Sequence, residues 1–163
     1  MRPSLRDALR AALEWVVLAL MAALTVVVVV GVGFRKAGAS LVWYDEVASI
    51  LLAWLTYYGA ALAALHRAHI GVPTLVDYAR GRVRAALVLV AEAVVLAFFA
   101  ALAWAGLRVM TVLQGSTLIS LPWVPAAFVQ SVIPLGALLF IAAELLALPE
   151  TLRGGGGRGE ERP

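Results

Sequence analysis

The 163-residue chain contains no cysteine. Disulfide bridges, thiolate nucleophiles and cysteine-based metal sites are therefore excluded. Charged residues are scarce as well, at 14% of the chain, and only two histidines are present. Two histidines supply too few ligands for a structural zinc site. We therefore expect no metal and no cofactor.

Catalytic motifs are also missing. The sequence has no phosphate-binding glycine-rich loop, no His-Glu-x-x-His helix and no nucleophile elbow. This pattern predicts a protein that is not an enzyme. The net charge of +3 is no nucleic-acid signature, because the basic residues flank apolar runs and form no stripe on a soluble helix.

Hydrophobic residues are abundant, at 63% of the chain, against roughly 45–50% in an average soluble domain. A helix needs about 20 apolar residues to cross a bilayer. We therefore expect an all-α integral membrane protein with four transmembrane helices. Their predicted spans are about 13–34, 45–66, 85–108 and 124–148.

These spans form a single membrane domain over residues 1–148, followed by a glycine-rich, charged tail over 149–163 that we expect to be flexible. Before the last span, the stretch TVLQGSTLISLPWVP combines polar residues with two prolines. It predicts either a loop or an interfacial segment.

The positive charges are distributed unequally about the predicted spans. Ten basic residues lie on the side of the termini, and three lie on the other side, namely Arg35, Lys36 and Arg108. The positive-inside rule then places both termini in the cytoplasm. Membrane lipid head groups are expected partners of four of these residues, which are Arg67, Arg80, Arg82 and Arg84.

The second span opens with two acids, Asp45 and Glu46. A helix N-terminus favours anions, so the pair either caps the helix in solvent or meets a basic partner protein. Trp43 and Tyr44 precede the acids where an aromatic belt is expected.

Aromatic residues also occupy the middle of this span, where a tyrosine hydroxyl in hydrocarbon is costly. These residues either pack within the four helices or form an interface with a larger partner. The candidate interface comprises Trp54, Tyr57, Tyr58, Gly59, Ala60 and Ala61.

Two further acids, Glu92 and Glu144, fall inside predicted spans. An intramembrane carboxylate is a functional hypothesis by default. Each is either a neutral or paired acid, or part of a proton or cation relay.

Several of these residues together resemble a known family. The second span opens with Trp43, Asp45 and Glu46, continues through Trp54 to a Gly-Ala step, and ends in Ala-His-Ile-Gly-Val around His69. The last span carries Ile-Pro-Leu-Gly around Pro134. In order and spacing, roughly from residue 33 to 148, the chain resembles the small membrane subunit of tripartite ATP-independent periplasmic (TRAP) transporters, the DctQ-like permeases.

The resemblance implies a small, non-catalytic subunit that braces a large transport subunit of about a dozen spans. In such systems a periplasmic solute-binding protein delivers an organic acid, and a sodium gradient drives uptake. The residues also leave two alternatives open. One is a self-sufficient, homo-oligomeric proton-coupled exporter that uses Glu14 or Glu92, and the other is a membrane scaffold without transport activity.

Overall fold

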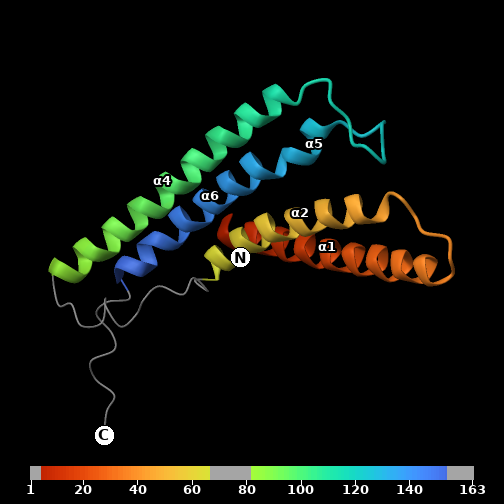
Figure 1. Cartoon of the computed structure of the whole chain (residues 1–163). Coiled ribbons are helices and arrows are strands. Elements are labelled where there is room, and N and C mark those ends of the chain that lie inside the picture. The colour runs from red at the N-terminus through yellow and green to blue at the C-terminus, as the bar shows by residue number, and fades with distance from the viewer. Residues whose placement is uncertain (1–4, 67–81, 154–163) are drawn as a thin grey trace, which may run out of the picture.

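The computed structural model describes residues 5–66 and 82–153. Four helices in this part are long and apolar enough to cross a membrane, and the described residues contain no β-strand beyond one isolated bridge between Thr117 and Pro125. The prediction of an all-α chain with four such helices is thus confirmed. The elements in chain order are α1 (Leu5–Lys36), α2 (Tyr44–Leu65), α4 (Arg82–Val112), α5 (Ala126–Gln130) and α6 (Val132–Arg153) (Figure 1).

The first helix is longer than the predicted span. Its 32 residues extend over about 48 Å at 1.5 Å per residue, whereas the hydrocarbon core is about 30 Å thick. The additional turns at its start carry Arg6, Asp7 and Arg10. These charged turns therefore extend the helix beyond the apolar stretch.

The last predicted span is broken in two. The sequence predicted one helix from residue 124, but the chain forms α5, interrupts the helix at Ser131 and begins α6 at Val132. Pro134 explains the break, because a proline ring clashes with the carbonyl four residues earlier and its nitrogen donates no hydrogen bond. The helix therefore restarts with Pro134 in its first turn, where proline is tolerated. At its other end α6 continues to Arg153, past the predicted end at residue 148.

The four long helices form an open row. Helix α1 packs on α2, α2 packs on α6, and α6 packs on α4, while α1 and α4 lie at opposite ends of the row. Figure 1 shows the α1–α2 pair and the α4–α6 pair diverging toward the end that carries residues 37–43 and 113–125. We call this end the loop end.

The core lies where α1, α2 and α6 meet. Half of its residues are alanines, which allow close helix approach, and the other half are large. Its members are Leu13, Ala61, Ala64, Leu65, Phe140 and Ala143. The ring of Phe140 stacks on Phe99 of α4 with the centroids 3.6 Å apart, and this contact extends the core along the row.

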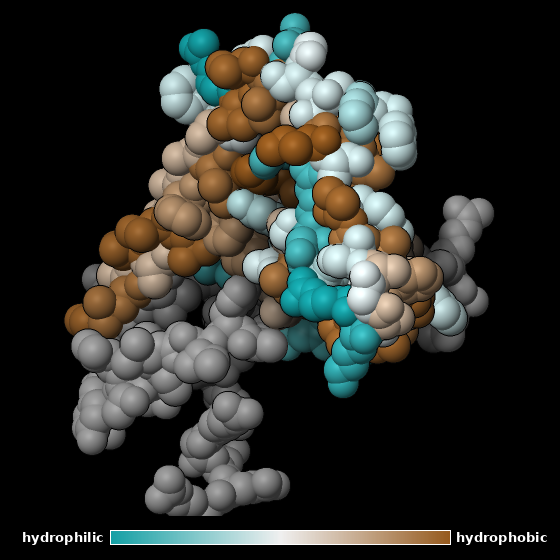
Figure 2. All heavy atoms as spheres, turned by 45° about the vertical axis from the view of Figure 1, so that its right-hand side comes forward, coloured by the Kyte–Doolittle hydropathy of each residue, from teal (hydrophilic) through white to brown (hydrophobic). Residues whose placement is uncertain are grey.

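Most other large apolar side chains are exposed. Trp15 is 75% exposed and Val94 is 64% exposed, although both are strongly hydrophobic. Figure 2 shows apolar side chains spread over the helices and polar side chains collected toward the loop end. This distribution is typical of helices whose outer faces contact lipid.

Candidate functional site

The turn between α1 and α2 is locked by Tyr44. This side chain is buried, at 5% exposure, and its ring lies against the backbone of Gly31, where any added side-chain carbon would overlap it. The Arg35 guanidinium lies 5.1 Å from the centre of the Tyr44 ring and 3.5 Å from a carboxylate oxygen of Asp45. The Tyr44 side chain therefore packs inside the chain and does not face outward.

The two acids of α2 have separate contacts. Asp45 pairs with Arg35 at the end of α1. Glu46 accepts hydrogen bonds from the backbone N–H groups of Ile119, at 3.2 Å, and Ser120, at 2.9 Å, and from the Ser120 hydroxyl. Within the described residues, the acids thus connect α1, α2 and the loop after α4. Sequence reasoning missed Ser120, which is 74 residues from Glu46.

The loop over residues 113–125 is itself ordered by backbone hydrogen bonds. The N–H of Leu118 donates to the Val124 carbonyl at 3.1 Å, and the N–H of Ala126 donates to the Ser116 carbonyl at 2.9 Å. Gly115 turns the chain with a φ of 85°, a conformation that glycine adopts without steric cost. The predicted loop is therefore a compact hairpin fastened to α2.

The aromatic residues of α2 have partners inside the chain. The Trp54 indole N–H donates to the Val129 carbonyl at 3.1 Å, and the Trp54 ring packs against Phe128 of α5. Tyr57 packs against α6 at Gly136, where an added side-chain carbon would lie 2.6 Å from the Tyr57 Cβ. Trp54 and Tyr57 therefore both make contacts within the chain, Trp54 with α5 and Tyr57 with α6.

The remaining members of the candidate interface differ in exposure. Ala61 is fully buried and Ala60 packs against the core, so Ala61 offers no surface to a partner. Gly59 has open space on the side where a side chain would project. Tyr58 is half-buried and contacts the Trp54 ring edge-on at 6.4 Å.

An apolar groove of about 480 Å³ lies between α1, α2 and α6. Trp54 and Tyr58 form its α2 wall and Leu139 its α6 wall. The α1 wall consists of Leu9, Ala12, Leu13, Val16, Ala19 and Leu20. Two predicted interface residues therefore line a concave surface, which the sequence did not indicate.

At the other end of the α1–α2 pair, polar contacts hold the helices together. The Arg6 Nη2 group donates to the Leu65 carbonyl at 2.9 Å, and Glu14 lies 2.8 Å from Arg10 and 3.3 Å from His66. The Glu14 carboxylate, one candidate for a proton site, thus takes part in a surface ion-pair cluster between α1 and α2.

The structure keeps the other predicted residues apart from this site. Glu92 on α4 and Glu144 on α6 are half-buried. Arg82 and Arg84 lie in the first turn of α4, and their side chains are outside the described part. Arg67, His69 and Arg80 lie outside the described residues.

A row of four membrane-length helices, fastened by one loop and carrying an apolar groove, defines a multi-pass integral membrane protein. Residues 24–154 match the family "Tripartite ATP-independent periplasmic transporters, DctQ component". The chain belongs to this family of transporter components, and the resemblance seen in the sequence is confirmed. A comparison with curated proteins found no match.

Proposed function

We propose that the chain is the small, non-catalytic membrane subunit of a sodium-driven tripartite uptake transporter in a bacterial inner membrane. Its partners are a large transport subunit of about a dozen spans and a periplasmic solute-binding protein, and the solute is an organic acid. The observation that carries the proposal is the family match over residues 24–154. The excess of basic residues on the side of the termini supports a topology with both termini in the cytoplasm.

The role within the complex is to brace the large subunit. Helices in lipid associate by close packing, because lipid tails are as apolar as the side chains they would replace. The groove between α1, α2 and α6 offers a concave surface of about 480 Å³ into which side chains of a partner helix fit. Trp54 and Tyr58 line it, and these two residue types are enriched at energetic centres of interfaces. We place the contact with the large subunit at this groove.

Filling the groove tests this placement. Ala19 of α1 is exposed and lines the groove, so Ala19→Trp occupies it without removing any contact inside the chain. Trp54→Ala is less informative because it also deletes the hydrogen bond to Val129. Overpacking costs about 1–3 kcal/mol, which corresponds to roughly 5- to 150-fold weaker binding of the large subunit.

The matched control is Ala22→Trp, on an exposed position of the same helix outside the groove. The chain is expressed with its large subunit, and the tagged chain is purified in mild detergent. We expect Ala19→Trp to lose most of the large subunit and Ala22→Trp to retain it. Equal recovery with both variants would place the contact on another face, and absence of the large subunit from the unmodified chain would refute the proposed function.

A further inference from the structure

The hairpin over residues 113–125 is held at a fixed depth relative to the membrane surface. Arg35 and Lys36 end α1, and Asp45 and Glu46 begin α2. Charged side chains are costly in hydrocarbon, so this end of the two helices marks the boundary between lipid and water. The hydrogen bonds from Ile119 and Ser120 to Glu46 keep the tip of the hairpin at that boundary.

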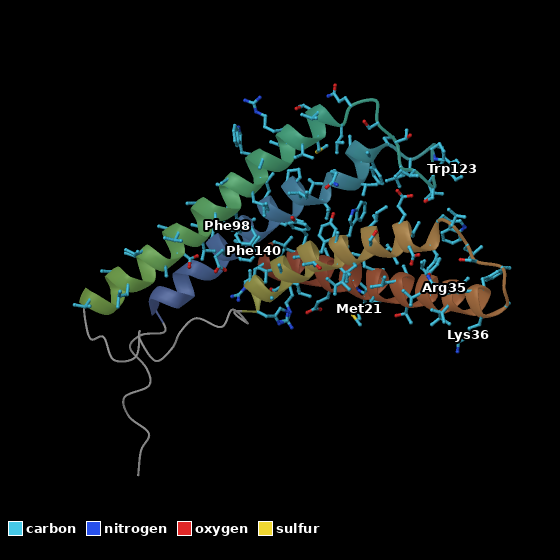
Figure 3. The ribbon with its side chains drawn as sticks, in the orientation of Figure 1. Met21, Arg35, Lys36, Phe98, Trp123 and Phe140 are labelled. Atoms are coloured by element: carbon cyan, nitrogen blue, oxygen red, sulfur yellow. The ribbon has the colours of Figure 1, made fainter. Side chains whose placement is uncertain are left out.

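The hairpin presents apolar side chains at this depth. Ile119 is 95% exposed and Trp123 is 76% exposed, although Ser120, which follows Ile119 in the sequence, is hydrogen-bonded to Glu46. In Figure 3, Trp123 projects from the hairpin at the same end of the molecule as Arg35 and Lys36. An ordered loop whose largest apolar side chains point outward presents a surface suited to an apolar environment.

We propose that this hairpin is a preformed membrane hook, which inserts Ile119 and Trp123 into the boundary between the head groups and acyl chains of the adjacent phospholipid leaflet. Tryptophan favours this boundary, because its ring is apolar while its indole N–H requires a hydrogen-bond acceptor. Glycerol ester and phosphate oxygens supply such acceptors. Ile119 contributes apolar area alone and reaches the upper acyl chains.

A lipid leaflet fits the surface better than a soluble partner protein. The two exposed side chains project at the depth fixed by the charged ends of α1 and α2, and a second tryptophan, Trp43, stands at the start of α2 with 37% exposure. Tryptophans gathered at one depth are typical of the membrane interface. Because Glu46 and the backbone bonds already order the hairpin, little conformational entropy is lost when it inserts.

Depth measurement with a nitroxide tests the hook, and the cysteine-free chain is a ready background for it. A nitroxide is attached to the full-length Ile119→Cys variant in phospholipid vesicles. The rate at which the nitroxide collides with oxygen, which concentrates in lipid, is compared with the rate at which it collides with a nickel chelate, which stays in water. Ser40→Cys, on an exposed position between α1 and α2, serves as the water control, and Val29→Cys, on an exposed face of α1, serves as the lipid control.

We expect the ratio of oxygen to nickel collisions at residue 119 to exceed one, between a value below one at residue 40 and the highest value at residue 29. Adding Trp123→Ala to the Ile119→Cys variant should lower the ratio toward that of residue 40. A ratio below one at residue 119 would show that the hairpin extends into water. Loss of access for both reagents, in vesicles that contain a co-purified partner, would mean that protein covers the hairpin. Either result overturns the hook, as does an unchanged ratio without Trp123.

The role of Glu46 is tested in the same assay. Glu46→Ala removes the acceptor for Ile119 and Ser120, so the nitroxide at residue 119 should become more mobile and its ratio should shift. Glu46→Gln keeps one acceptor oxygen and should give an intermediate shift. Asp45→Ala is the control, because Asp45 pairs with Arg35 and not with the hairpin. Equal shifts with Asp45→Ala and Glu46→Ala would contradict a preformed hook.

Discussion

Two glycines near the end of α1 differ sharply in their surroundings. A side-chain carbon at Gly31 would lie 2.6 Å from Cγ and 2.8 Å from Cε2 of the Tyr44 ring, and it would overlap Cδ2 as well. At Gly33, two residues further along the same helix, nothing lies within 4 Å. Comparing alanine substitutions at these two positions therefore separates the effect of helix propensity on stability from the effect of packing against Tyr44.

The expected effects have opposite signs. Replacing a helix-interior glycine by alanine stabilises a helix by roughly 0.5–1 kcal/mol, and this gain applies to both positions. Overpacking at Gly31 costs about 1–3 kcal/mol, because the buried Tyr44 ring also lies against the Arg35 guanidinium and cannot move away freely. We expect Gly33→Ala to stabilise the protein, and Gly31→Ala to be less stable than Gly33→Ala by about 1–3 kcal/mol.

The measurement is the loss of helical circular dichroism as SDS is added to protein in mild detergent micelles. Gly33→Ala should shift the midpoint to higher SDS and Gly31→Ala to lower SDS. In a Tyr44→Ala background the ring is gone, so Gly31→Ala should become stabilising. Equal midpoints for the two single variants, or no change of sign in the Tyr44→Ala background, would show that Tyr44 does not pack against Gly31.

Two other predictions follow from the proposed function. A reporter active only in the cytoplasm should work when it is fused after Pro163 and be silent within residues 35–40, and the reverse pattern would refute a topology with both termini inside. The isolated chain in proteoliposomes should move no solute under a sodium or proton gradient, because transport is assigned to the large subunit. Robust uptake or efflux would favour the exporter, and a block by Glu92→Gln would then identify its proton site.

The sequence predicted the four long helices well, because a span must satisfy its backbone hydrogen bonds internally and bury about 20 apolar residues in lipid. Both requirements are properties of a single stretch of chain. The loop before the last helix was equally predictable from the sequence, since prolines and hydroxyl residues interrupt the apolar run. The break at Ser131 was missed, although Pro134 is the signal that identifies it.

The neighbours of each helix were not predictable in the same way. A helix face that contacts lipid and one that contacts another helix are both apolar, so hydrophobicity does not tell them apart. Trp54 and Ala61 illustrate the difficulty. Their spacing placed them on one candidate interface, yet Trp54 donates a hydrogen bond to α5 and Ala61 is fully buried in the core. The contact of Glu46 with Ser120 also depends on two segments far apart in the sequence.

Three of the residues that carry the family resemblance, Glu46, Pro134 and Gly136, share a physical property in this chain. Pro134 packs on α4 where Gly106 leaves room for it, and Gly136 leaves room for Tyr57 of α2. Glu46 fastens the hairpin to the start of α2. Each of these contacts joins segments that are distant in the sequence and fixes how closely they approach. Positions that set such spacing admit few residue types, whereas lipid-facing positions accept almost any apolar side chain. A short set of such residues in a fixed order therefore carries information that the long apolar stretches, which any membrane helix could share, do not.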